Sequence, residues 1–176
     1  MPVFKFTIAY DGTGFVGWQR QRAGTSIQGL LEDALAELDG RPVAVAGAGR
    51  TDAGVHALAQ VASASLDREV DGATLVRAVN MRLPAAVRVL SAVLVPASFR
   101  VRFDARSKTY RYRIWNAEVL SPFDRQYAWH VPVPRLDVDA MTSAALLVEG
   151  HHDFIAFQGA GSEAQTTERV VFRSRA

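Results

Sequence analysis

Apolar and polar residues alternate through the first ten positions of the chain. Phe4, Phe6, Ile8 and Tyr10 share one face of an extended backbone, and the intervening residues share the other. This period of two predicts a strand over residues 3–10 with one buried face.

A helical period replaces the alternation between residues 25 and 40. Thr25 and Gln28 have the spacing of a capping box, which predicts the start of the helix, and Gly40 fits its C-terminal stop. The apolar positions between them recur every three or four residues: Ile27, Leu30, Leu31, Ala34, Leu35 and Leu38.

Similar patterns predict a strand over 42–48, a strand over 57–66, a helix over 73–81 capped near Asp71 or Gly72, and a strand over 87–95. The order strand, helix, strand, strand, helix, strand is the split βαβ arrangement of ferredoxin-like domains. The segment 107–115 starts the pattern again, with a helix within 135–150 and a strand from residue 168.

We therefore expect an α+β protein with two tandem ferredoxin-like (RRM-like) halves that form one mostly antiparallel sheet. The predicted halves are residues 1–103 and 104–176. The second half lacks its last strand, helix and strand by this count, so we expect it to be incomplete.

Composition narrows the class of protein. The chain has 176 residues, of which 49% are hydrophobic, and it contains no cysteine, which excludes disulfides and thiolate chemistry. No apolar run reaches the length of a membrane span, and the first residues do not resemble a signal peptide. We expect a soluble cytoplasmic protein.

The Gly- and Ala-rich stretch from Val45 to Ala62 places Arg50 and Asp52 in a turn between two predicted strands. A dinucleotide-binding loop is disfavoured because Asp52 stands where the third glycine belongs and would repel a pyrophosphate. A metal site is also disfavoured, since His56 offers only a second ligand, and His151, His152 and Asp153 fit a loop at a helix end. Two interpretations remain: a carboxylate that caps the turn, or a single nucleophile.

Basic residues cluster between residues 100 and 113, against the single acid Asp104: Arg100, Arg102, Arg106, Lys108, Arg111 and Arg113. The aromatic side chains among them suit a nucleic acid, through phosphate contacts and base stacking. We expect Tyr110 to stack on an unpaired base and Tyr112 to lie in the core. A solvated strand face is the alternative.

Three motifs together resemble the tRNA pseudouridine synthase A family: "YDGTGFVGWQRQ", "AGRTDAGVHALAQVA" and "FRVRFDARSKTYRYRIWN". The resemblance extends from Phe4 to about Arg169. It implies an isomerase that converts uridine to pseudouridine in the anticodon stem-loop of tRNA, at positions 38–40, with an active site in the cleft between the two halves. It implies no metal and no cofactor.

By the same resemblance, Asp52 is the catalytic nucleophile, acting on either the uracil ring or the ribose C1′. Arg50 would help to extrude the target base, and Tyr110 would contact the flipped uridine. Arg20, Arg111 and Arg113 are further candidates for RNA contact. Family members act as homodimers on one tRNA.

This chain departs from the family pattern at its end. Family members continue into an apolar segment ending in Met-Val-Arg, whose arginine pairs with the catalytic aspartate, and no such segment occurs here. We therefore expect a truncated family member of weak or absent activity. An inactive remnant or a non-catalytic RNA-binding module is the alternative function.

Overall fold

The computed structural model describes residues 1–159 and 166–176. These form two compact units, Met1–Thr109 and Tyr110–Ala176, referred to below as unit 1 and unit 2. The division falls six residues after the boundary predicted from the sequence. Each unit is described by itself.

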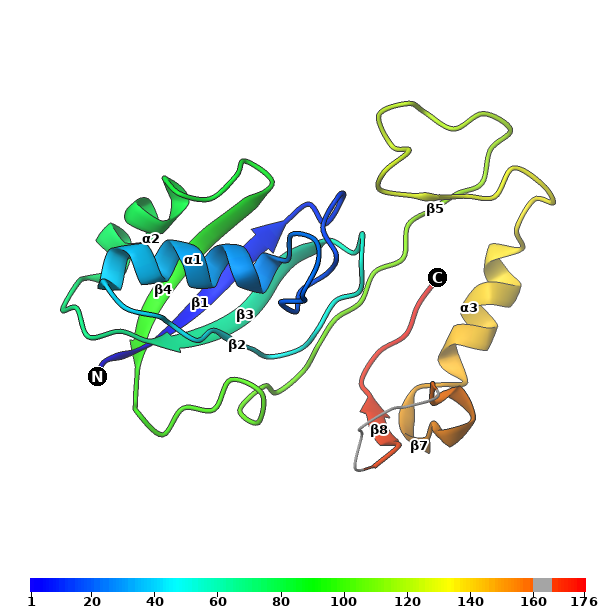
Figure 1. Ribbon diagram of the computed structural model, residues 1–176. Helices are drawn as coiled ribbons and strands as arrows, with labels where there is room; N and C mark the ends of the chain where they lie inside the picture. Colours follow the sequence, from blue (N-terminus) through cyan, green and yellow to red (C-terminus); the bar gives the residue numbers. More distant parts are fainter. Residues whose placement is uncertain (160–165) are drawn as a thin grey trace. The chain divides into compact units, whose positions relative to one another are not determined.

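Unit 1 is an antiparallel sheet covered by two helices. Its elements are β1 (Val3–Tyr10), α1 (Ile27–Asp39), β2 (Ala46–Gly47), β3 (Ala57–Ser65), α2 (Gly72–Asn80) and β4 (Val87–Val95). The strand order is β2-β3-β1-β4, and both helices lie on one face of this sheet (Figure 1). The predicted α+β class and order of elements are confirmed for this unit, whereas the tandem repeat stays a prediction.

The core lies between the helices and the sheet. Phe4, Phe6, Ile8 and Tyr10 are buried, as the alternation of β1 predicts. They pack with one stripe of α1 and one of α2, which includes Ile27, Leu31, Leu35, Leu75 and Val79. The alternation along β1 and the helical stripes are therefore the signals that place this core.

The capping of α1 differs by one residue from the prediction. Ser26, not Thr25, is the N-cap, and its hydroxyl accepts a hydrogen bond from Gly29 N. Gln28, expected in the capping box, instead bonds to the loop before the helix and to the chain after it. Gly40 ends the helix in the left-handed conformation, as predicted.

Asp39, the last residue of α1, fastens the turn between β3 and α2. Its side chain is 1% exposed, and its carboxylate accepts hydrogen bonds from the backbone N–H groups of Asp67 and Arg68. Burial opposes ionisation, but these two donors and the charge of Arg41, 3.1 Å away, outweigh it, so the pKa of Asp39 lies below its ordinary value.

Strand β2 is shorter than the predicted strand over 42–48. The backbone N–H of Val45 donates to the Glu32 carboxylate, and its carbonyl accepts from the Gln28 amide. Both partners are side chains of α1. The segment before Ala46 therefore satisfies its polar groups on a helix rather than in the sheet.

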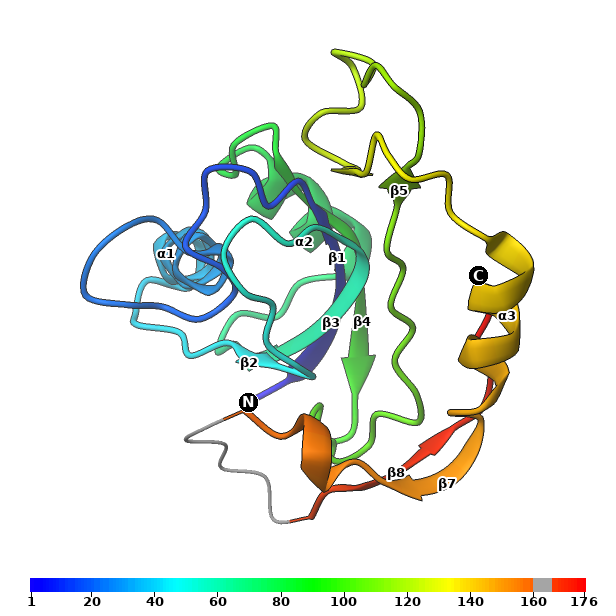
Figure 2. The same ribbon diagram turned by 90° about the vertical axis from the view of Figure 1, so that its right-hand side faces the viewer.

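Unit 2 contains short elements: β5 (Ile114–Trp115), β6 (Trp129–His130), α3 (Val138–Leu146), β7 (Gly150–Asp153), a 3₁₀ turn (Ile155–Phe157) and β8 (Glu168–Val171). Strands β7 and β8 pair antiparallel, whereas β5 and β6 pair parallel. Figure 2 shows β7 and β8 lying side by side. None of the described residues of unit 2 is buried.

Two expectations for unit 2 are wrong. The strand predicted over 107–115 is reduced to its last two residues, because among the described residues only these two pair with a neighbouring strand. Tyr112, expected in the core, is 88% exposed, since no strand in the described structure pairs with the segment that carries it. In the described part of the chain, no helix has the length and hydropathy needed to cross a membrane.

Candidate active site

The turn that carries Arg50 and Asp52 is fixed through the residue between them. The backbone carbonyl of Thr51 accepts a hydrogen bond from Trp18 N at 2.9 Å, and its hydroxyl bonds to the hydroxyl of Tyr10 at 2.9 Å. Burial raises the pKa of Tyr10, although the bond to Thr51 lowers it in part. Tyr10 therefore stays neutral and can donate to Thr51 at neutral pH.

The same turn also packs closely against the loop that contains Gly17 and Trp18. Gly17 has φ = 101°, and a β-carbon placed on it would lie 2.6 Å from the Thr51 carbonyl oxygen. A β-carbon on Gly47 would lie 2.7 Å from the Trp18 indole, which is itself buried. Both positions therefore need glycine for the turn and the Trp18 loop to approach this closely.

The far end of the turn is tied to the loop that follows β1. The Val55 N–H donates to the carbonyl of Asp52 at 3.2 Å, which closes the turn. The His56 Nδ1 atom lies 3.1 Å from the Gly12 N–H and 3.0 Å from a carboxylate oxygen of Asp11. The turn is thus held at both ends and in its middle.

The side chains of Arg50 and Asp52 are exposed on this fixed backbone. Among the described residues, neither side chain has a hydrogen bond or ion pair, and the two do not pair with each other. Side chains without partners on a well-anchored backbone are suited to binding a ligand rather than to stabilising the turn. It disfavours the interpretation of Asp52 as a turn cap.

The other candidate residues are distributed over both units. Tyr110, 73% exposed, and Arg111 and Arg113 belong to unit 2, where Arg113 pairs with Asp124 at 3.2 Å. Arg20 belongs to unit 1, where acidic side chains of α1 hold its guanidinium. The Lys108 ammonium lies over the backbone of Gly49, at 3.0 Å from where a β-carbon would stand.

Sequence reasoning missed the residues that support the turn. Tyr10 was expected only as a core residue, and nothing in the sequence indicates that its hydroxyl reaches Thr51. Trp18 lies in a Gly-rich, aromatic motif, but nothing in the sequence indicates that this residue packs against the turn. Among the described residues there is no cluster of three or more His, Cys, Asp or Glu side chains that could hold a metal.

Comparisons with known proteins agree on one family. The family model described as tRNA pseudouridine synthase matches residues 7–104, which include the Trp18 loop and the Asp52 turn. A tRNA pseudouridine synthase A of Solibacter usitatus is 49% identical over 99% of this chain and 73% of its own length. Proteins of the same name from Methylacidiphilum infernorum and Solidesulfovibrio magneticus are also each 49% identical, over 88% and 98% of this chain.

The chain spans 60% of the length of the Methylacidiphilum protein and 64% of the Solidesulfovibrio protein. The matched regions contain the rigid turn with its exposed Arg50 and Asp52. On the strength of the family match and of these relatives, the chain belongs to the tRNA pseudouridine synthase family.

Proposed function

We propose that this protein isomerises uridine to pseudouridine in tRNA, with Asp52 as the nucleophile. The observation that supports this most is the turn itself: Thr51 is bonded on two sides, while the Asp52 carboxylate beside it is exposed and has no partner among the described residues. An exposed carboxylate without a partner is accessible to a substrate, so it is available for attack.

The reaction needs no co-reactant for its atoms to balance. The bond from ribose C1′ to N1 of uracil breaks, the base turns, and a bond from C1′ to C5 forms. The C5 hydrogen leaves as a proton and N1 gains a proton. The Asp52 carboxylate would add transiently, at the uracil ring or at C1′, and leave unchanged.

The target base must leave its stack before it can turn. Extrusion of a stacked base costs roughly a few kcal/mol. An exposed Arg50 could fill the vacated position through its planar guanidinium, and the exposed ring of Tyr110 could stack on the flipped uridine.

The basic residues Arg111 and Arg113 would bind phosphates of the same RNA. By resemblance, the substrate site is the anticodon stem-loop at positions 38–40. A cytoplasmic homodimer and a second ferredoxin-like half that extends the sheet belong to the same proposal.

Carbodiimide mapping of an unmodified tRNA transcript tests this proposal. The transcript is incubated with the protein, treated with carbodiimide and alkali, and read by primer extension. We expect new stops at uridines 38, 39 or 40 and none in a transcript with cytidines at these positions. Binding of the transcript without any new stop would favour the alternative, an inactive remnant or a non-catalytic RNA-binding module.

A further inference from the structure

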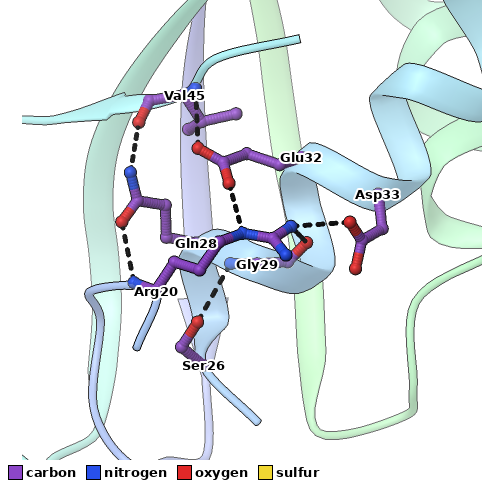
Figure 3. A network of polar contacts seen from close by, with 7 residues as sticks. All are labelled: Arg20, Ser26, Gln28, Gly29, Glu32, Asp33 and Val45. Carbon is purple, nitrogen blue, oxygen red and sulfur yellow. Dashed lines mark hydrogen bonds and ion pairs between the residues drawn. The ribbon is translucent and has the colours of Figure 1, made fainter. Parts of the chain in front are cut away.

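Arg20 is held by acidic side chains of α1 rather than extended into solvent (Figure 3). Its Nε donates to Glu32 at 2.6 Å, and one terminal nitrogen donates to Asp33 at 2.6 Å. The same nitrogen donates to the carbonyl of Gly29 at 2.9 Å. The guanidinium thus bonds three acceptors on successive turns of a single helix.

The network continues from Arg20 to the segment that leads, through β2, into the Asp52 turn. Gln28 accepts from the Arg20 backbone N–H and donates to the Val45 carbonyl, both at 2.9 Å. The second oxygen of Glu32 accepts from Val45 N at 3.3 Å. Figure 3 shows these contacts side by side, so α1 fastens the Arg20 loop and the Val45 segment together.

A second set of bonds joins the same loop to the turn itself. The carbonyl of Trp18 accepts from the backbone N–H of Gln28 at 2.9 Å. The N–H of Trp18 donates to the carbonyl of Thr51, the residue next to Asp52. If the segment that carries Trp18 and Arg20 moved away from α1, Thr51 would therefore shift with it.

We propose that Arg20 is a positioning residue for the Asp52 turn and not an RNA contact, an inference that rests on the proposed function. The local charge supports this assignment. One arginine faces two carboxylates, Glu32 and Asp33, so the group carries a net charge of −1, which repels phosphate rather than attracting it. Ion pairs with this exposure contribute little to stability by themselves, but several that converge on one planar guanidinium fix its geometry.

The test separates turnover from RNA binding. Arg20→Met is compared with Arg22→Met, which removes an exposed arginine two residues away. We expect Arg20→Met to lower kcat at least tenfold while the KM for tRNA and the salt dependence of binding stay as in the unaltered protein. Glu32→Met should lower kcat in the same way, and Arg22→Met should not.

An RNA contact would give the opposite pattern. Arg20→Met would then raise KM, reduce the slope of log K against log salt by about 1, and leave kcat unchanged. This result overturns the proposal, as does a kcat of Glu32→Met equal to that of the unaltered protein.

Hydrogen exchange at the Trp18 amide gives a measurement that does not depend on turnover. We expect faster exchange in Arg20→Met, and an intermediate rate in Arg20→Lys, which keeps one ion pair and serves if Arg20→Met does not fold. Unchanged exchange in both would overturn the positioning role. Absence of turnover in the unaltered protein would instead refute the proposed function.

Discussion

Gly17→Ala should displace the Asp52 turn, and its effect can be worked out from the geometry. The new β-carbon would lie 2.6 Å from the Thr51 carbonyl oxygen and 3.0 Å from the Asp52 carbonyl carbon. The closest ordinary approach of carbon to a carbonyl oxygen is about 3.3 Å, so one backbone must move by about 0.7 Å. The flexible end of a side chain is not involved, and the strain therefore falls on the turn.

Two energies add in this variant. A left-handed conformation costs a residue with a β-carbon roughly 1–2 kcal/mol, and overpacking adds typically about 1–3 kcal/mol. Alanine returns about 0.4–1 kcal/mol by restricting the unfolded chain. We expect a net loss in the free energy of unfolding of about 3 kcal/mol. A misplacement of roughly 1 Å can cost about a hundredfold in rate, so we expect kcat to fall roughly ten- to a hundredfold.

Gly14→Ala is the matched control. Gly14 has a similar positive φ of 81°, but a β-carbon there meets nothing within 4 Å. We expect a change in stability within about 1 kcal/mol and no change in kcat. Urea unfolding and release of tritium from tRNA labelled at uridine C5 measure the two quantities. Equal losses of stability and of kcat in the two variants would refute the close approach of Gly17 to the turn.

Three further predictions concern other parts of the chain. Because the folded pKa of Asp39 lies below its ordinary value of 3.8, its contribution to stability is present above that value and is lost as the pH falls through the folded pKa; Asp39→Asn should flatten the acid decline in urea midpoint, and a decline identical in both proteins would contradict this. Limited trypsin digestion should cleave unit 2 before unit 1, because only unit 1 has buried residues among those described; mass spectrometry showing the reverse order would contradict it. Arg111→Gln should reduce the salt slope of tRNA binding by about 1 without altering its salt-independent part, and an unchanged slope would exclude a phosphate contact.

The sequence was most informative where one period dominates a whole element. The alternation of Phe4, Phe6, Ile8 and Tyr10 places β1 in the core, and the spacing of apolar residues places α1. These patterns arise because one face of β1 and one face of α1 are buried, and the periodic spacing of apolar residues shows this directly. The element order of unit 1 follows from them.

The sequence was less informative where tertiary contacts override local pattern. The segment before Ala46 alternates as a strand does, yet Val45 bonds to side chains of α1 that are distant in sequence. Tyr112 alternates as a strand residue does, but no neighbouring strand pairs with its segment in the described structure. In both cases the deciding partner is not local.

The candidate site also has some features that local sequence predicts and others that depend on tertiary contacts. The glycines and charges of the turn single out Asp52 as a candidate nucleophile from the sequence alone, and its role in the reaction stays a prediction. The bonds of Thr51 to Tyr10 and Trp18 join three separate segments, and no spacing within one segment records them. Arg20 illustrates the converse, since its residue type predicts an RNA contact, whereas its bonds to Glu32 and Asp33 are visible only in the structure.

The central claim is that the Asp52 carboxylate carries out the chemical step. Asp52→Asn keeps the size of the side chain and removes its charge, and Glu69→Gln makes the same change at an exposed acid elsewhere in unit 1. The measurement is single-turnover tritium release from tRNA labelled at uridine C5, together with binding of the same tRNA. We predict that Asp52→Asn abolishes release while binding persists, and that Glu69→Gln alters neither; release by Asp52→Asn at the rate of the unaltered protein would contradict the account.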